Sequence, residues 1–314
     1  MGKLDLYTGK WTKQKIDEAV TETRENGTIY FDMRPFYKNT RAGLEKLNER
    51  LFKKRPDLIL QIVTENNEDL LLLPQLENIK KLYFSNYESL DEIKTMRHLT
   101  SLEIYNVNKK ALDTGFLEGL DALRDLSVTG KVKNIEAVGK CKNLEKLYLS
   151  TTIENYAFAQ PLDNIKTIFI DNCIAPGDFT LLNKQTLEKL SLTQIRGLEN
   201  IDAIKNFPSL KRLKLSASKI KTLPKMNSLL NLRELDLRGM KIWDNPEVIK
   251  TIPLLEKLTL EEINTKLDAE RFYFLTEMET LSEINFRFMD FGKKRIEKLT
   301  ARFAQSGREH IIAK

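Results

Sequence analysis

The sequence predicts an α/β solenoid, in which short parallel strands alternate with tight return segments. The first indication is a recurring L-x-x-L-x-L pattern, in which another apolar residue can replace leucine and whose starts lie 20 to 26 residues apart. The second is a change of apolar spacing inside each unit, from every third residue to every second residue. A period of three suits a 3₁₀-like segment, and a period of two suits a strand. Each unit is therefore interpreted as one coil.

The repeat is clearest between Leu198 and Leu215. Its apolar residues are Leu198, Ile201, Ile204, Phe207, Leu210, Leu213 and Leu215. The pattern begins at Ile79, Leu99, Leu123, Leu144, Ile165, Leu187, Leu210, Leu232, Leu255 and Leu281. These residues and intervals resemble the leucine-rich repeat family, above all the 22-residue subclass of internalins and of a phosphatase-regulator protein. The resemblance implies a curved parallel sheet on a concave face, with 3₁₀, irregular or short helical returns on a convex face. It indicates a fold rather than a function.

The sequence departs from that family at the ninth position of the repeat, where a buried asparagine is common. The residues found there are Tyr87, Val107, Lys131, Thr152, Cys173, Ile195, Ser218, Met240, Ile263 and Met289. We therefore expect uneven turns after the strands, held by apolar packing rather than by an asparagine ladder.

Residues 1–56 precede the regular coils and are predicted to form an N-terminal α/β cap. Apolar spacing predicts a helix over 11–25 with Thr12 as its N-cap, a strand over 28–33, and a second helix over 39–54 that ends before Pro56. The next strand, 57–63, would join the array in parallel, so the cap is the size of an enlarged first coil.

The leucine-rich repeat array is assigned to residues 57–290, with about 11 coils. Two longer returns, 109–121 and 242–253, are expected to contain helical turns, and 268–278 is predicted to be a helix before a last strand over 281–288. Residues 291–314 form the predicted C-terminal capping helix and tail, with an amphipathic helix over 294–303 and fraying after Gly307. A cap is expected because the last coil would otherwise expose its apolar cross-section and its strand edge.

Composition favours a monomeric cytoplasmic protein. The chain has 51 basic and 45 acidic residues and a net charge of +6. It lacks the roughly 18 consecutive apolar residues of a membrane helix, and its first six residues lack the apolar core of a signal peptide. Cys141 and Cys173 lie in the middle of the array and are interpreted as core residues in a reducing compartment.

Alternation along each strand predicts which side chains face outward on the concave surface. The fifth repeat position runs Gln61, Tyr83, Glu103, Ser127, Tyr148, Phe169, Ser191, Lys214, Asp236, Thr259 and Asn285. The seventh runs Val63, Ser85, Tyr105, Thr129, Ser150, Asp171, Thr193, Ser216, Arg238, Glu261 and Arg287. The aromatics in the first half of these columns have two interpretations: a protein-binding hot spot, or stacking that stabilises adjacent strands.

The second half of the predicted concave face is charged. Its charges either pair across neighbouring coils and solvate the surface, or select a partner by their pattern. The candidate partner-binding residues from both halves are Tyr83, Tyr105, Tyr148, Phe169, Lys146, Lys189, Arg212, Lys214, Asp236 and Arg238.

Motifs for catalysis or metal binding are not found in the sequence. Of the two histidines, His98 lies on a return segment and His310 lies in the tail, so they predict neither a metal cluster nor a triad. Gly130, Gly139 and Lys140 lack the spacing of a phosphate-binding loop. We therefore predict no enzyme activity, catalytic residue, metal or cofactor.

The leading functional hypothesis is a non-enzymatic scaffold that binds a protein on its concave face, such as an inhibitor or an immunity-type masking protein. One alternative is a regulatory subunit of an enzyme. Another is a basic nucleic-acid-binding solenoid, suggested by a pI near 9.0. Nucleic-acid binders more often gather basic residues on one face, so neither a nucleic-acid partner nor a membrane partner is expected.

Overall fold

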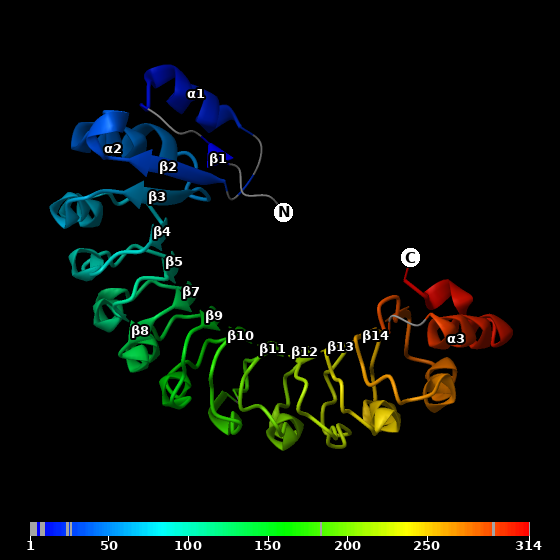
Figure 1. Ribbon diagram of the computed structural model, residues 1–314. Coiled ribbons are helices and arrows are strands. Elements are labelled where there is room, and N and C mark those ends of the chain that lie inside the picture. The colour runs from blue at the N-terminus through cyan, green and yellow to red at the C-terminus, as the bar shows by residue number, and fades with distance from the viewer. Residues whose placement is uncertain are drawn as a thin grey trace. The chain divides into compact units, whose positions relative to one another are not determined.

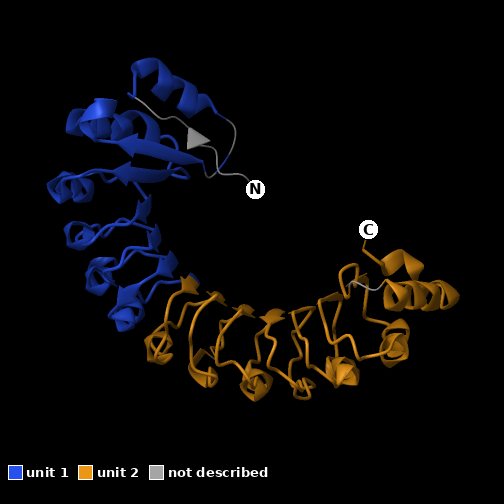
Figure 2. Ribbon diagram, viewed as in Figure 1, with its two compact units in different colours: residues 1–147 blue, residues 148–314 orange. Residues whose placement is uncertain are grey.

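A computed structural model describes residues 5, 6, 10–22, 25, 27–182, 184–290 and 293–313, with the backbone alone at 5 and 6. Some predicted features lie partly outside this range: the first four residues, residues 23 and 24 of the predicted first helix, and residues 291 and 292 at the start of the predicted C-terminal cap. The chain forms two compact units, residues 1–147 and 148–314 (Figure 2).

The first unit is a parallel sheet whose returns include two α-helices (Figure 1). Its helices are α1 (Lys13–Thr21) and α2 (Arg41–Leu47). Its strands are β1 (Asp5–Leu6), β2 (Thr28–Asp32), β3 (Ile59–Val63), β4 (Lys81–Ser85), β5 (Ser101–Asn106) and β7 (Asp125–Gly130). These strands lie side by side in chain order, all parallel. The predicted N-cap of the first helix is confirmed, since the Thr12 side chain accepts a hydrogen bond from the Lys15 N–H.

The second unit repeats one strand and one return per coil. Its strands are β10 (Thr167–Asp171), β11 (Lys189–Thr193), β12 (Arg212–Ser216), β13 (Glu234–Arg238), β14 (Lys257–Glu261) and β15 (Glu283–Asn285). They are parallel and pair in chain order. A further strand, β9 (Lys146–Ser150), spans the boundary between the two units. The strands of this unit line one side and the short helices line the other (Figure 2).

The returns are mostly 3₁₀ helices, as the period of three predicts. In the second unit they are η7 (Ala157–Ala159), η8 (Thr180–Leu182), η9 (Asp202–Asn206), η10 (Pro246–Thr251) and η11 (Ala269–Glu277). In the first unit they include η3 (Asn67–Gln75), η4 (Asp91–Ile93), η5 (Gly115–Gly119) and η6 (Ile135–Lys140). The helix expected over 268–278 is thus a 3₁₀ helix.

The long return at 109–121 contains more than the helical turn we expected. Besides η5 it holds β6 (Leu112–Asp113), which pairs in parallel with β8 (Val132–Lys133) to form a second, two-stranded sheet. Thr114, which is fully buried, joins the same two returns by donating hydrogen bonds to the carbonyls of Lys133 and Asn134.

The second predicted helix, over 39–54, is interrupted. It consists of α2 followed by a π-helical turn, η2 (Asn48–Phe52). Asn48 is buried, and its side-chain oxygen accepts a hydrogen bond from the Asn78 N–H at 3.0 Å. A polar side chain inside this helical segment therefore joins it to the return before β4, and apolar spacing alone does not reveal that contact.

The hydrophobic core is a ladder of the apolar repeat positions. In the second unit Leu190, Leu213, Leu235, Leu258 and Ile284 are successive partners across the sheet, and each is at most 2% exposed. Because each coil packs its apolar residues against the equivalent residues of the neighbouring coils, the hydrophobic core is continuous along the unit.

The turn after each strand depends on the eighth repeat position. Six of these residues have a left-handed backbone, with φ between 44° and 101°: Asn86, Gly130, Asn172, Gln194, Gly239 and Glu262. At several of them the N–H continues the sheet, as where Gln194 donates to the Ser216 carbonyl at 2.9 Å. The ninth residue then turns inward, and Tyr87, Cys173, Ile195, Met240, Ile263 and Met289 are buried. The expected apolar packing at this position is confirmed for these coils.

The C-terminal end is packed, contrary to the predicted fraying after Gly307. Helix α3 (Lys294–Gln305) buries Leu299 and Phe303. The Arg308 guanidinium donates to the carbonyls of Leu275, Thr276, Met278 and Leu281. The tail then pairs with the last strand, because the Ala313 N–H donates to the Ile284 carbonyl at 2.8 Å.

None of the helices in the described part of the chain has both the length and the apolar character needed to cross a membrane.

Candidate functional site

The outward side chains of the second unit form three columns in strict register. The third-position column is Thr167, Lys189, Arg212, Glu234, Lys257 and Glu283. The fifth-position column is Phe169, Ser191, Lys214, Asp236, Thr259 and Asn285. The seventh-position column is Asp171, Thr193, Ser216, Arg238 and Glu261. We call this surface the strand face of the second unit; the register agrees with the predicted columns from Phe169 onward.

The strand face of the second unit has a hollow of about 440 Å³. Its lining includes Phe169, Lys189, Ser191, Arg212, Lys214 and Asp236. Ser191 is small and buried, whereas Phe169 beside it is only half-buried. The aromatic ring therefore forms one wall of a depression whose floor is low at Ser191.

Most charges on this face pair with one another. Arg212 contacts Glu234 at 2.8 Å across adjacent strands, and Lys257 contacts Glu283 at 2.6 Å. Arg238 bridges two carboxylates, at 2.8 Å from Asp236 and 2.6 Å from Glu261.

These contacts favour the charged forms of Arg238 and Lys257. Hydrogen bonding to Asp236 raises the pKa of Arg238, and hydrogen bonding to Glu283 raises the pKa of Lys257. For these residues the structure favours the solvated-face interpretation, because water screens exposed ion pairs of this kind and they contribute little to stability.

Two lysines on the same face are different. Within the described residues, Lys189 and Lys214 have no carboxylate within 4.0 Å, although both line the hollow. They lie on adjacent strands, since Lys189 pairs with Arg212 and Ser191 pairs with Lys214. The hollow therefore combines an aromatic wall with two cations that lack an internal partner.

Tyr148 is held by a carboxylate network. Its hydroxyl donates to Asp171 Oδ2 at 3.3 Å, and the hydroxyl of Thr193 donates to Asp171 Oδ1. Burial, followed by the charge of Asp171, raises the pKa of Tyr148. These bonds fix the phenol tip and so favour a strand-stabilising role for this ring, while Phe169 lines open space.

The remaining candidates belong to the first unit. Tyr83 is half-buried in the fifth column, where it pairs with Gln61 and Glu103. Tyr105 in the seventh column is 39% exposed. Lys146 contacts Asp125 at 3.2 Å. The four candidate aromatics are thus divided between the two units, with Tyr83 and Tyr105 in the first and Tyr148 and Phe169 in the second.

Sequence reasoning missed one aromatic of the first unit. Tyr30 pairs with Gln61 and so belongs to the same column as Tyr83. Its hydroxyl donates to Asp32 at 3.1 Å, and Arg34 binds the same buried carboxylate with two nitrogens. The sequence pattern did contain the information needed to place Tyr30. Ile29 and Phe31 on either side of it occupy the inward positions of a strand like those of the array, so Tyr30 faces outward.

The chemistry of the cysteines is that of core residues. Both are unpaired and buried, and burial raises the pKa of Cys141 to about 12 and that of Cys173 to about 11. Neither thiol is ionised near neutral pH. Across the residues whose positions are described, no group of three or more His, Cys, Asp or Glu side chains is arranged to hold a metal ion.

Comparison with known proteins supports the fold. No protein-family model and no curated protein matches the sequence. Among solved structures, an internalin from Listeria monocytogenes is 15% identical, with a TM-score of 0.48 over 83% of this chain and 76% of that one. A leucine-rich repeat protein from Leptospira interrogans is 18% identical, with a TM-score of 0.48 over 73% of this chain and 66% of that one. A TLR13–ssRNA13 complex gives 18% identity and a TM-score of 0.54 over 78% of this chain and 37% of that one.

The parallel sheet and the 3₁₀ returns define the class of protein, and the fold shared with the TLR13 structure agrees with it. The chain has a leucine-rich repeat solenoid fold, as predicted.

Proposed function

We propose that this protein is a non-enzymatic scaffold that binds another protein through its strand face. The observation that carries the proposal is the hollow of the second unit, where Phe169 stands beside Lys189 and Lys214. Protein-binding hot spots favour aromatic anchors in depressions bordered by polar side chains. An aromatic wall beside cations with no internal partner is well suited to such a contact.

The electrostatics of the face support binding rather than catalysis. A general acid or base near neutral pH needs a pKa moved toward 7. On this face the pKa shifts of Arg238, Lys257 and Tyr148 are all upward, away from 7. The groups therefore keep fixed charge states over the physiological range, which suits recognition.

The finer role that we propose is masking of a partner protein, as an inhibitor or an immunity-type protein would do. Occlusion needs a broad surface, and the three in-register columns provide one without further chemistry. We place this activity in the cytoplasm, because two buried free thiols suit a reducing compartment. We also propose that the protein acts as a monomer. A regulatory subunit of an enzyme would use the same surface and differs only in the partner.

Nucleic-acid binding is the second candidate. One of the similar structures is a complex with single-stranded RNA, and the net charge here is +6. The strand face of the second unit argues against this candidate, because Glu234, Asp236, Glu261 and Glu283 alternate with the cations. A phosphate backbone would meet repulsion along each of these columns.

A pull-down from source-cell lysate tests the scaffold proposal. We expect the wild type to capture a protein that is lost with Phe169→Ala. Phe288→Ala is the matched control, because this ring is 61% exposed and follows the last strand rather than facing out from the sheet. Unchanged capture by Phe169→Ala would contradict the site, and capture that is abolished by nuclease would favour the nucleic-acid candidate.

A further inference from the structure

We propose that the hollow on the strand face of the second unit binds an acidic, extended segment of a partner protein, with carboxylates of that segment on Lys189 and Lys214. This inference rests on the proposed function and specifies the chemistry of the partner.

The paired charges account for every other ionic group around the hollow. Arg212 is bound to Glu234, Lys257 to Glu283, and Asp236 to Arg238. Lys189 and Lys214 are the cations that remain among the described residues lining this depression. A carboxylate placed there gains attraction without breaking an existing ion pair, whereas an additional cation would have to displace one.

The spacing of the two lysines selects an extended segment. They occupy diagonal positions on adjacent parallel strands, because Lys189 is opposite Arg212 and Lys214 lies two residues beyond Arg212. Since the strands are about 4.8 Å apart and two residues rise about 6.6 Å, the Cα atoms of such diagonal neighbours are roughly 8 Å apart. In an extended chain, side chains at alternate residues share a face and lie about 6.6 Å apart. Carboxylates two residues apart therefore match the lysine pair.

The floor and wall of the hollow indicate what accompanies the carboxylates. Phe169, Ser191 and Lys214 are successive members of one column. Since Ser191 is small, space remains between the ring and the lysine for an apolar side chain of the partner. Burial of such a side chain against Phe169 supplies affinity, while the lysines supply orientation and specificity.

Acidic protein fits this surface better than a polyphosphate chain. A nucleic acid carries a charge on every unit, and its continuation from Lys214 along the column would meet Asp236 at the next strand. A protein segment can instead place neutral residues at those points. The carboxylates of Asp236 and Glu234 would then select against longer runs of negative charge.

The test uses a fluorescent peptide of alternating glutamate and leucine, measured by anisotropy against the full-length protein. A peptide with glutamine in place of glutamate is the matched probe, and a single-stranded oligothymidine is the third. We expect saturable binding of the glutamate peptide and at least about tenfold weaker binding of the glutamine peptide and of the oligonucleotide. A carbodiimide, which joins amines to carboxylates, should cross-link the glutamate peptide to Lys189 and Lys214, as identified by mass spectrometry.

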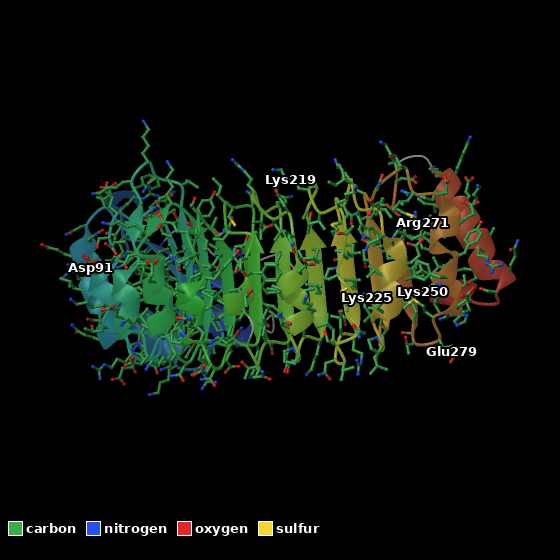
Figure 3. The ribbon with its side chains drawn as sticks, turned by 90° about the horizontal axis from the view of Figure 1, so that it is seen from below. Asp91, Lys219, Lys225, Lys250, Arg271 and Glu279 are labelled. Atoms are coloured by element: carbon green, nitrogen blue, oxygen red, sulfur yellow. The ribbon has the colours of Figure 1, made fainter. Side chains whose placement is uncertain are left out.

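Charge-reversal variants locate the binding. The double variant Lys189→Glu with Lys214→Glu should bind the glutamate peptide at least about tenfold more weakly than the wild type, whereas Lys189→Arg with Lys214→Arg should keep the wild-type affinity. The control is Lys205→Glu with Lys225→Glu, which changes the net charge by the same amount on the return segments. Its affinity for the peptide should stay within about twofold of the wild-type value. Lys205 lies in η9. Lys225, which is labelled in Figure 3, lies on the return that follows β12. If the reversed variant does not fold, the carbodiimide cross-links of the wild-type protein to Lys189 and Lys214 keep the test decisive.

The outcomes separate this inference from the scaffold proposal. Equal binding of the glutamate and glutamine peptides, cross-links elsewhere, or tighter binding of the oligonucleotide would overturn it. If the lysate partner were lost with the Phe169 variant yet retained by the reversed lysine variant, the scaffold would stand and the acidic partner would be wrong. If both variants retained the partner, the scaffold site itself would fail.

Discussion

At the scale of single residues, the left-handed turn positions are expected to store strain. Glu262 is exposed and has a φ of 48°, a backbone conformation that glycine adopts without steric strain because it has no Cβ atom. We predict that Glu262→Gly raises the free energy of unfolding by about 1 kcal/mol, because a non-glycine residue costs roughly 1 to 2 kcal/mol in this region. Ala217→Gly is the control at the same repeat position, where φ is not positive, and should lower stability. Urea denaturation measures both, and a loss of stability with Glu262→Gly would contradict the strain.

The buried phenol of Tyr87 predicts a dependence on alkaline pH. Its hydroxyl donates to the Ile62 carbonyl at 3.0 Å and accepts from the Thr64 N–H at 3.3 Å, and burial raises its pKa from 10.0 to about 12. The folded state therefore retains a proton that the unfolded state releases near pH 10. The resulting stabilisation is complete below pH 10 and is lost as the pH rises through about 12.

Tyr87→Phe tests this titration. At pH 8 the variant should be less stable by about 1 kcal/mol, because the Ile62 carbonyl and the Thr64 N–H lose their partner. The difference between the two proteins should shrink as the pH is raised above 10, since the wild type alone carries the phenol. Chemical denaturation at a series of pH values measures it. A difference that stayed constant up to pH 11 would mean that the hydroxyl is not buried.

The sequence was sufficient to predict which residues share a column, because strand alternation determines which side chains face outward and the repeat spacing determines which of them are opposite one another. Phe169, Ser191 and Lys214 were assigned to one column, and the register confirms it. Which charges pair could not be predicted, because pairing depends on the rotamers of side chains such as Arg238, which reaches both its own strand and the next. The division into 1–56, 57–290 and 291–314 and the partner-binding role of the site residues stay predictions.

At the scale of elements, each coil contributes its own apolar layer. Leu213 in β12 is 2% exposed and stacks between Leu190 and Leu235. We predict that Leu213→Ala lowers the free energy of unfolding by about 2 to 5 kcal/mol through lost burial and a residual cavity. Lys214→Ala, on the same strand but facing outward, should change it by less than about 0.5 kcal/mol. A thermal or urea melt in which both variants behaved alike would contradict the repeat alignment.

The C-terminal tail is a second element whose role can be measured. Arg308 binds four carbonyls of the preceding segment, and Ala313 continues the hydrogen bonding of β15. We predict that Arg308→Leu releases the tail and speeds hydrogen exchange at the Ala313 N–H at least about tenfold, because buried carbonyls lose a charged donor. Exchange in β12 should remain unchanged. Unaltered protection of Ala313 would show that the tail packs without the arginine.

Apolar spacing revealed the existence of elements better than their type. The period of three predicted 3₁₀ returns, yet the helix expected over 39–54 changes to a π turn where Asn48 reaches Asn78. Likewise β6 and β8 are only two residues long and pair across 20 residues, a contact that no local pattern reveals. The packed tail depends on Arg308, whose partners lie 27 to 33 residues earlier.

At the scale of the whole molecule, we expect the effect of a destabilising substitution to pass mainly to neighbouring coils, because the protein has a stacked core rather than one central core. In stacked repeats each coil contacts mainly its neighbours. We predict that Leu213→Ala accelerates hydrogen exchange most in β11, β12 and β13, with a decreasing effect at greater distance along the second unit. Leu102→Ala, equally buried in β5, should act in the same way within the first unit. Mass-spectrometric exchange of both variants measures this, and uniform acceleration throughout would indicate a single cooperative core.

The in-register columns of the second unit also set fixed distances along its strand face. Neighbouring residues of a column are separated by one strand spacing, about 4.8 Å, although they are 22 or 23 positions apart in the chain, as at Phe169, Ser191 and Lys214. Duplication or loss of one coil would change the distance between the column residues on either side of it by one strand spacing and leave the other distances unchanged. A partner's spacing could thus be followed during evolution by changing the number of coils rather than the residues that touch it.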